Sequence, residues 1–314
     1  MTEHLFIVNP AAGKTDRTAF VEKAAKSARE SGNADGEITV YRTACAGDAT
    51  RFLEDKLKKT EHAVRVYSCG GDGTLNECVK GVYTSGKSDV ALGVIPTGSG
   101  NDFIRSFGIP ESSFRSVRDM MQGQVQPIDL IRVTGEKGPE YICVNVASAG
   151  FDAAVCRRME NFRRVPMLGG SMAYNMALAR QFVSHLGHRF ELYGDGKRMR
   201  TPGKDEYLFA LVANGKYYGG GFHCSPKSSL SDGKLNLILI EAIPRMQFLG
   251  LLGPYRKGEY FEKLGKRMLH KTVKTVEIRA DMPLDMNLDG EILSIKNPRL
   301  TVLPSALNLI LPIS

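Results

Sequence analysis

A glycine-rich turn that encloses an acid is the first feature of the sequence that could do chemistry. The segment Tyr67–Gly81, YSCGGDGTLNECVKG, places Asp72 among Gly70, Gly71 and Gly73 at the end of a β-prone run. Glycines readily take positive φ and expose backbone N–H groups, which bind anions at the start of a helix. An acid would repel a phosphate there unless a divalent cation lay between them, so Asp72 predicts Mg²⁺. The competing interpretation is a turn that only connects a strand to a helix.

Two further segments have the same order of strand, turn and helix. In VNPAAGK (8–14), Asn9 and the following proline close a strand, and Lys14 can reach an acid or a phosphate, although a plain connecting turn explains the segment equally well. In VIPTGSGNDFIRSFG (94–108), a glycine turn predicts a second wall of the same nucleotide site. Its candidate residues are Gly98, Ser99, Gly100 and Asn101. Helix caps are also expected, at Thr74 and Asn101.

A fourth segment, NLDGE (287–291), lies late in the chain. Asp289 and Glu291 flank a glycine there. The competing interpretation is a type I′ hairpin with Asp-Gly at its tip, which is a common use of this dipeptide. The spacing alone favours the hairpin.

The first part of the chain alternates strands and helices. Strands are predicted over 4–8, 36–43, 63–69 and 91–95, and helices over 17–31, 48–59 and 74–83. This alternation predicts a parallel, doubly wound α/β sheet. Ligands of such sheets bind where strands end and helices begin, which is where the first three segments lie.

After Gln126 the pattern changes to strands separated by turn residues, with one helical stretch predicted over 153–186. A mostly antiparallel second domain is expected. The predicted domains are therefore 1–126, which 304–314 completes by packing back on it, and 127–303. The predicted strands of the second domain are IDLIRV (128–133), EYICVNV (140–146), YLFALVA (207–213), KLNLILIE (234–241), TVKTVEIRA (272–280) and LTVLP (300–304).

Composition narrows the class of protein. The chain has 314 residues, of which 42 are Lys or Arg and 34 are Asp or Glu, for a net charge of +8. A basic protein suits nucleic acid, a membrane surface or a phosphorylated ligand, and no nucleic-acid-binding motif is present. No apolar run is long enough to span a membrane, and the start does not read as a secretory signal. Six cysteines without a CxxC pair predict reduced thiols and a cytoplasmic protein.

Together these segments resemble the catalytic domain of the diacylglycerol kinase family. VNPAAGK, GGDGTLNE, PTGSGNDF, SDGKLNL and LDGE occur in the order of that family, and the likeness covers nearly the whole chain. The branch that it resembles is that of the soluble bacterial lipid kinases, related to sphingosine and ceramide kinases. The resemblance implies a phosphofructokinase-like α/β domain, an antiparallel β-sandwich domain, and ATP in the cleft between them. GGDGT by itself is shared with NAD kinases and, loosely, with phosphofructokinases.

The resemblance also assigns roles to residues. Asp289 matches the general base proposed in the bacterial branch, with Glu291 beside it, whereas sphingosine kinases suggest Asp72 for that role. Asp232 in SDGKL matches a ligand of a second, structural Mg²⁺, but Ser231 stands where relatives often have another acid. Glu77 matches an acid that lies near the Mg²⁺ in relatives. The nucleotide-site positions are Asn9, Thr43, Gly70, Gly71, Gly73, Thr74, Glu77, Gly98, Ser99, Gly100 and Asn101.

The reaction implied is the ATP- and Mg²⁺-dependent phosphorylation of a lipid hydroxyl, with diacylglycerol giving phosphatidic acid as the default. The alternatives are an NAD kinase-like enzyme and a non-catalytic nucleotide-binding protein. The apolar run 248–255 followed by the basic stretch Arg256–Lys271 predicts transient docking on the inner, anionic membrane face. A solvated helix face explains the same residues equally well. Whether the protein forms a homodimer is left open.

Overall fold

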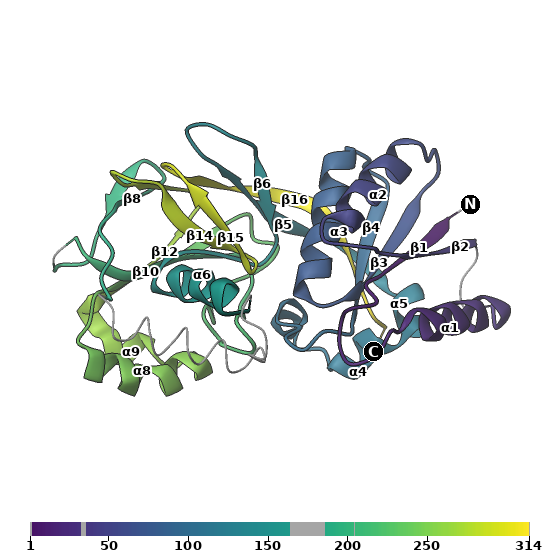
Figure 1. Cartoon of the computed structure of the whole chain (residues 1–314), viewed down its shortest axis with the longest axis horizontal. Coiled ribbons are helices and arrows are strands. Elements are labelled where there is room, and N and C mark those ends of the chain that lie inside the picture. Colours follow the sequence, from purple (N-terminus) through teal and green to yellow (C-terminus); the bar gives the residue numbers. More distant parts are fainter. Residues whose placement is uncertain (1, 33–35, 164–185, 204, 314) are drawn as a thin grey trace. The chain divides into compact units, whose positions relative to one another are not determined.

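The structure is a computed structural model that describes residues 2–32, 36–163, 186–203 and 205–313. The chain forms two compact units (Figure 1). The first consists of Met1–Leu130 and Pro304–Ser314, and the second of Ile131–Leu303. The predicted boundary after Gln126 lies inside a strand, β5 (Gln124–Thr134), and the C-terminal residues belong to the first unit.

The first unit is built on a parallel sheet. Its order is β2-β1-β3-β4, and the end of β16 continues it by pairing in parallel with β4. β1, β3 and β4 are almost entirely buried, as expected of parallel strands covered on both faces. The strands are β1 (Glu3–Val8), β2 (Glu37–Arg42), β3 (Val64–Gly70), β4 (Val90–Pro96) and β16 (Arg299–Leu311).

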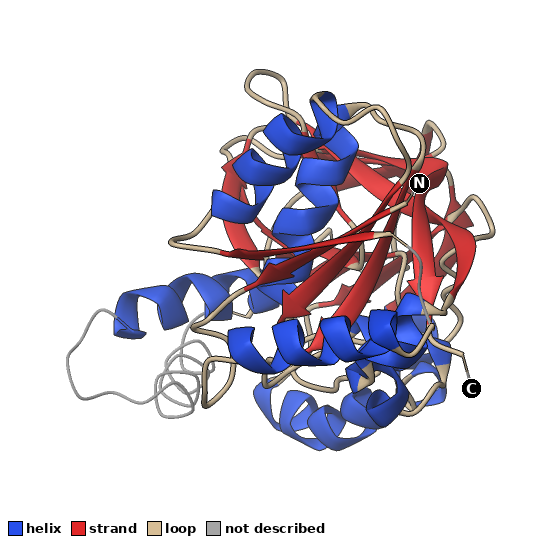
Figure 2. Cartoon of the chain, turned by 90° about the vertical axis from the view of Figure 1, so that its right-hand side faces the viewer, coloured by secondary structure: helices blue, strands red, loops and turns tan. Residues whose placement is uncertain are grey.

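Helices cover both faces of this sheet (Figure 2). α2 packs against α3, and α1 packs against α5. α1 buries Val21, Ala25 and Ala28, which are spaced to lie on one face of a helix. The doubly wound α/β prediction is therefore confirmed. The helices are α1 (Thr18–Glu30), α2 (Asp48–Lys58), α3 (Asp72–Ser85), η1 (Phe103–Phe107), α4 (Glu111–Arg115) and α5 (Val117–Met121).

The second unit contains an antiparallel six-stranded sheet in the order β12-β11-β10-β7-β14-β15. Its strands are β7 (Val146–Gly150), β10 (Tyr207–Ala213), β11 (Leu235–Glu241), β12 (Met268–Val273), β14 (Leu284–Leu288) and β15 (Glu291–Ile295). Facing it are strands of the other sheet, namely β5, β6 (Tyr141–Cys143), β8 (Glu191–Gly194), β9 (Lys197–Met199), β13 (Thr275–Arg279) and the start of β16. The predicted antiparallel sandwich is confirmed.

Two apolar layers hold the second unit together. One joins the two sheets and includes Ala147 and Ala149 of β7. The other lies on the opposite face of the six-stranded sheet, under α6 (Phe151–Arg163), α8 (Arg245–Lys257) and α9 (Phe261–Leu264), with η2 (Gly265–Arg267) after them. The helical stretch predicted over 153–186 is confirmed as α6 up to residue 163, and 164–185 lie outside the described residues.

Candidate active site

The two glycine turns of the first unit touch each other through their backbones. β3 and β4 are adjacent, and the N–H groups of Thr97 and Gly98 donate to the carbonyl of Gly70 at 2.8 Å and 3.3 Å. A Cβ atom on Gly98 would lie 2.5 Å from the Cα atom of Gly71, closer than real Cβ atoms approach other atoms. These turns follow the carboxyl ends of neighbouring parallel strands, the usual ligand position in this architecture.

Gly98→Ala should therefore lower catalytic activity about 100-fold, because the added methyl group pushes the two turns apart. The measurement is the rate of the phosphoryl transfer that the sequence resemblance implies, at saturating nucleotide. Gly73→Ala is a matched control for folding, since a Cβ atom there meets nothing within 4 Å and the melting temperature should be unchanged. Normal activity in Gly98→Ala would show that this contact does not matter.

Asp72 fastens the second glycine turn to the first. It lies in the first turn of α3, and its Oδ1 accepts the backbone N–H groups of Asp102 at 2.9 Å and Phe103 at 3.3 Å. A Cβ atom on Gly100 would lie 2.9 Å from Oδ2 of the same carboxylate, so the backbone of that turn approaches it closely. Asp72 thus places its negative charge between the two turns and orders the second of them.

Asn101 spans the second turn, in a left-handed conformation with φ 53°. Its side-chain amide donates to the carbonyl of Gly98 at 3.0 Å and to Oε1 of Glu111 at 3.1 Å. Its Oδ1 is buried and accepts no hydrogen bond from the described residues. The expectation that Asn101 caps the next helix is wrong, because Asp102 holds that position before η1. Ser99 is exposed at the tip of the turn.

Asn9 and Thr74 connect the turn at 8–14 to α3. The Asn9 amide donates to Oγ1 of Thr74 at 3.0 Å, and the Asn9 carbonyl oxygen accepts the N–H of Ala11 at 3.0 Å. The expectation that Thr74 caps α3 is wrong, since α3 begins at Asp72 after Gly71 and Thr74 is buried inside its first turn. A Cβ atom on Gly70 would lie 2.2 Å from Oγ1 of Thr74, which requires glycine there.

Glu77 and Thr43 are used within the fold. The Glu77 carboxylate accepts the N–H of Gly47 at 2.8 Å and that of Ala49 at 3.2 Å, so it caps the start of α2 from the neighbouring helix. Thr43 is buried and its N–H donates to the carbonyl of Val8 at 2.9 Å. The role of either residue at a nucleotide or at Mg²⁺ stays a prediction.

In the second unit, the Asp289 carboxylate accepts hydrogen bonds from the backbone N–H groups of three consecutive residues. Asp289 and Gly290 form the two-residue loop between β14 and β15, with φ angles of 51° and 96°, which matches the type I′ hairpin. The Asp289 Oδ1 accepts the N–H groups of Asn145 at 3.1 Å and Val146 at 2.8 Å and the thiol of Cys143 at 3.1 Å. Its Oδ2 accepts only the N–H of Val144, at 2.6 Å, among the described donors.

Burial and hydrogen bonding act on the acidity of Asp289 in opposite directions. Burial raises its pKa above the usual range, and the hydrogen bonds from Val146, Cys143, Val144 and Asn145 lower it. The net direction is upward. A carboxylate with a raised pKa suits a general base. Glu291 begins β15 two residues later and is partly exposed.

The residues present fit a nucleotide with Mg²⁺ in the first unit. Backbone N–H groups of the glycine turns suit phosphate oxygens, and the unsatisfied Oδ1 of Asn101 marks a place for a polar ligand group. Within the described residues, no group of three or more His, Cys, Asp or Glu side chains is placed to hold a metal. Asp232, predicted to bind a structural metal, is exposed, and its Oδ1 accepts the N–H of Lys234 at 3.0 Å.

A third carboxylate, Asp152, was missed in the sequence. It lies in the first turn of α6, directly after β7, and its Oδ2 accepts the hydroxyl of Ser148. Burial raises its pKa from 3.8 to about 6, although the hydrogen bond from Ser148 lowers it. The signal was present in AGFDA (149–153), where a strand, a glycine with φ 113°, an acid and a helix follow one another as they do around Asp72.

The titration of Asp152 should make the stability of the protein depend on pH. A folded-state pKa near 6, against 3.8 when unfolded, means that the buried carboxylate is stabilised by protonation. That contribution, about 3 kcal/mol, is fully present below pH 3.8 and is lost as the pH rises through 6. The melting temperature of Asp152→Asn relative to the natural protein should therefore rise between about pH 4 and pH 7. A difference that is constant with pH would contradict this.

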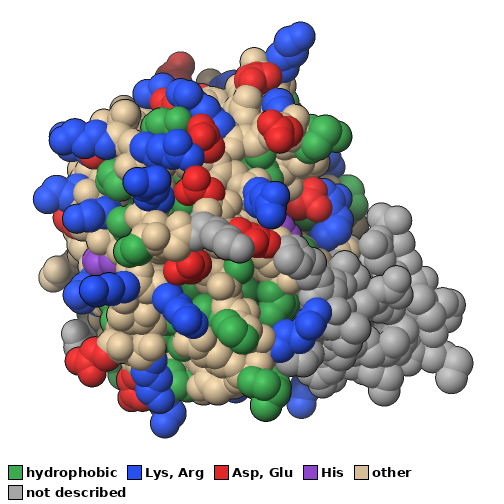
Figure 3. Space-filling model, turned by 90° about the vertical axis from the view of Figure 1, so that its left-hand side faces the viewer, with side chains coloured by type: hydrophobic (Ala, Val, Ile, Leu, Met, Phe, Trp, Pro, Cys, Tyr) green, Lys and Arg blue, Asp and Glu red, His purple; other side chains and the backbone are tan. Residues whose placement is uncertain are grey.

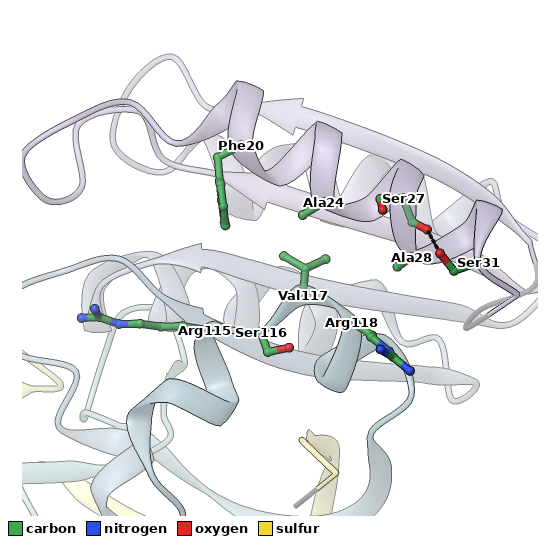
Figure 4. Close-up of a pocket in the computed structure, with 9 residues that line it drawn as sticks. All are labelled: Phe20, Ala24, Ser27, Ala28, Ser31, Arg115, Ser116, Val117 and Arg118. Atoms are coloured by element: carbon green, nitrogen blue, oxygen red, sulfur yellow. Dashed lines mark hydrogen bonds between the residues drawn. The ribbon is translucent and has the colours of Figure 1, made fainter.

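A hollow of about 480 Å³ lies elsewhere on the first unit, between α1 and the α4–α5 segment. In Figure 4, Phe20 and Ala24 of α1 face Val117, while Arg115 and Arg118 extend to the sides. None of the predicted site residues lines it. The glycine turns, and not this hollow, therefore define the candidate active site of the first unit.

Comparisons with known proteins agree with this geometry. Residues 3–133 match the model of the "Diacylglycerol kinase catalytic domain", and residues 145–311 match that of the "YegS C-terminal NAD kinase beta sandwich-like domain". A probable lipid kinase YegS-like of Pseudomonas aeruginosa is 30% identical over 304 residues, which cover 96% of this chain and 92% of that protein. The chain belongs to the family of YegS-like lipid kinases, with a diacylglycerol kinase catalytic domain. It is therefore a phosphotransferase with an alcohol group as acceptor.

Other members of this family and its fold are similar over most of their length. The diacylglycerol kinase of Bacillus subtilis is 27% identical over 286 residues, which cover 91% of this kinase and 88% of that protein. A crystal structure of a putative diacylglycerol kinase from Bacillus anthracis superposes with a TM-score of 0.74 at 22% identity, covering 98% of this chain and 95% of that one. That superposition supports the fold. Within the described residues, no helix of this lipid kinase is long and apolar enough to cross a membrane.

Proposed function

We propose that this kinase transfers the γ-phosphate of ATP, in the presence of Mg²⁺, to the hydroxyl group of a lipid, with diacylglycerol as the first acceptor to test. The observation that supports ATP most directly is the pair of touching glycine turns, fastened by Asp72, at the carboxyl ends of β3 and β4. Their N–H groups suit the phosphates, and Mg²⁺ bound near Asp72 would neutralise charge on the transferred group.

Asp289 is the residue that we propose takes the proton of the lipid hydroxyl. Its carboxylate is held in one orientation by three backbone N–H groups, so it is ready to accept a proton without rearranging. Its upward-shifted pKa increases its strength as a base. Phosphoryl transfer needs little more from the protein than the positioning of the hydroxyl and the stabilisation of charge.

The direct test is to incubate the purified protein with radiolabelled ATP, Mg²⁺ and diacylglycerol in mixed micelles, and to separate the lipids by chromatography. Labelled phosphatidic acid is the expected product. A parallel reaction on a total lipid extract would find a different lipid acceptor. Labelled NADP on adding NAD, without any labelled lipid, would replace the proposal with an NAD kinase-like activity.

We further propose that α8 docks the kinase on the anionic, cytoplasmic face of a membrane. The predicted apolar run 248–255 turns out to contribute mostly to the core, where Phe248, Leu251 and Tyr255 are buried. The apolar side chains that α8 exposes are instead Met246, which is 78% exposed, and Leu249, which is 47% exposed. They suit insertion among lipid head groups.

Exposed basic side chains lie at the end of α8 and in the segments that follow it. Arg256 and Lys257 end the helix, and the exposed basic residues beyond it are Lys263, Lys266, Arg267 and Lys271. Figure 3 shows basic side chains spread over a face of this unit, with hydrophobic side chains exposed between them. Cations beside apolar anchors favour an anionic surface over a neutral one.

Changing Met246 and Leu249 to serine together should weaken binding to vesicles of phosphatidylglycerol at least about 10-fold, because both apolar side chains are lost. Co-sedimentation with the vesicles measures this. Met282→Ser is the control, since Met282 is a 72% exposed methionine of the same unit in the turn between β13 and β14, and this variant should bind normally. Binding that is insensitive to salt and to anionic lipid would refute docking.

A further inference from the structure

A cluster of polar side chains is set into an apolar layer of the second unit. The layer lies under α6 and α8 and includes Val146, Phe151 and Val155. Ser148 on β7 is buried within it and donates its hydroxyl to Asp152. Polar groups in such a layer are normally satisfied by partners, and their presence away from water needs a reason.

The two oxygens of the Asp152 carboxylate differ in their partners. Its Oδ2 accepts the Ser148 hydroxyl. Its Oδ1 is shielded from solvent and accepts no hydrogen bond of normal geometry from the described residues, although the backbone N–H groups of Asp152 and Ala153 lie close enough to lower the pKa of the carboxyl. A nearby cation on α6, Arg157, pairs instead with Asp285, through Nε at 3.2 Å. A buried acceptor without a donor costs free energy, about 1–3 kcal/mol, and a ligand that supplies the donor recovers it.

Further polar groups from other elements surround this carboxylate. Burial raises the pKa of the Tyr218 hydroxyl well above its usual range, and the nearby Asp152 carboxylate raises it further. Tyr218 shares a hydrogen bond with Tyr255 of α8 at 3.1 Å. On the sheet side, the amide of Asn287 donates to the sulfur of Cys156 on α6 at 3.8 Å. The cluster therefore joins β7, α6, β14, α8 and the segment between β10 and β11.

This cluster lies next to Asp289 on the same sheet. Ser148 pairs across the ladder with Asn287, which is two residues before Asp289. Val146, which donates its N–H to Asp289, is two residues before Ser148 on β7, a distance of about 7 Å along the strand. A small head group held at Asp289 would therefore be within reach of groups at the Ser148–Asp152 pair.

We propose that Asp152 is a specificity-determining residue of the acceptor site. Its Oδ1 accepts a hydrogen bond from a second donor on the lipid head group, a hydroxyl or ammonium group next to the hydroxyl that receives the phosphate. The preferred acceptor is then a lipid with a free diol or an amino alcohol. Diacylglycerol has no second donor and leaves Oδ1 unpaired. This inference rests on the proposed lipid kinase activity and on Asp289 facing the acceptor hydroxyl.

The decisive comparison uses two acceptors that differ in one hydrogen-bond donor. These are 1-monoacylglycerol and its 2-O-methyl ether, presented in mixed micelles with ATP and Mg²⁺. The natural protein should phosphorylate the diol with a kcat/KM about 10-fold higher or more, since sites built to bond a donor reject analogues that lack it. Equal values for the two lipids would overturn the inference while leaving a lipid kinase. No phosphorylation of any lipid would overturn the proposed function as well.

Variants then assign the preference to Asp152. Asp152→Leu should abolish the preference for the diol over its methyl ether, by slowing the phosphorylation of the diol alone. Asp152→Asn should keep part of the preference for the diol. It should lose the preference for a long-chain 2-amino-1-alkanol, because the negative charge that pairs with the ammonium group is gone. Asp285→Asn is a matched control, since it removes a carboxylate that pairs with Arg157 on the same helix and should leave the preference intact. A preference for the diol that survives Asp152→Leu would refute the assignment to Asp152. The comparison of the two lipids uses the natural protein, so it remains a test even if a variant fails to fold.

Discussion

Asp72→Asn is expected to lower the turnover of lipid by about 100- to 1,000-fold while leaving the protein folded. The asparagine oxygen can still accept the N–H groups of Asp102 and Phe103, which Oδ1 of Asp72 accepts at 2.9 Å and 3.3 Å. The second glycine turn therefore keeps its anchor. What is lost is the negative charge, and with it the affinity for Mg²⁺ beside the phosphates.

The measurements for Asp72→Asn are kcat at saturating lipid, the KM for Mg²⁺–ATP and the melting temperature. The matched control is Asp48→Asn, because the Oδ2 of Asp48 also accepts a backbone N–H, that of Ala44, at 2.8 Å, but lies at the start of α2. The control should keep normal turnover. A turnover of Asp72→Asn close to normal at low Mg²⁺ would show that the charge at this position serves neither metal nor phosphate.

Asp289→Asn is expected to lower kcat by about 100- to 10,000-fold, because the amide cannot take the proton of the lipid hydroxyl. It should also lower the melting temperature. An amide has one acceptor oxygen, so the N–H groups of Asn145 and Val146, or that of Val144, would lose their acceptor. The loss of kcat must therefore be separated from the loss of stability.

Asp195→Ala makes that separation. Asp195 and Gly196 also form a two-residue loop with positive φ angles, between β8 and β9, and the Asp195 Oδ1 accepts the N–H groups of Lys274 and Thr275 at 2.9 Å and 2.8 Å. Alanine removes this acceptor oxygen and should cost stability without lowering kcat. If Asp289→Asn retains kcat at a temperature where it is folded, then Asp289 only braces the hairpin, and Asp72 becomes the better candidate for the base.

The nucleotide side of the site could be predicted in detail because its signals are local. A glycine turn after a strand and before a helix, with an acid inside it, is fixed by the φ preference of glycine and by the alternation of elements. Gly70, Gly71 and Asp72 follow one strand, and Gly98 and Gly100 follow its neighbour. Since the carboxyl ends of parallel strands share one edge of a sheet, the sequence could indicate that these turns lie together.

Helix caps and the use of individual side chains were harder to predict. Thr74 and Asn101 are good capping residue types, yet neither caps a helix. Thr74 accepts a hydrogen bond from Asn9 of another turn, and Asn101 donates to the carbonyl of Gly98 across its own turn. Glu77, which was predicted to lie near the Mg²⁺, follows Asp72 by five residues but caps α2 from the neighbouring helix α3. Nothing in the local sequence distinguishes a carboxylate that faces a ligand from one that satisfies the backbone of a neighbouring helix.

The sequence by itself determined the two kinds of domain, the glycine turns and the candidate acids, because composition, periodicity and turn preferences act over a few residues. Only the tertiary structure decided what each acid contacts. Asp289 is bound by the thiol of Cys143, which lies 146 residues away in the chain, and α8 buries Phe248 while exposing Met246. The unpaired Oδ1 of Asp152 is likewise a result of the tertiary structure. Burial and hydrogen-bond partners set the acidity and the role of a carboxylate, and both come from segments that meet only when the chain folds.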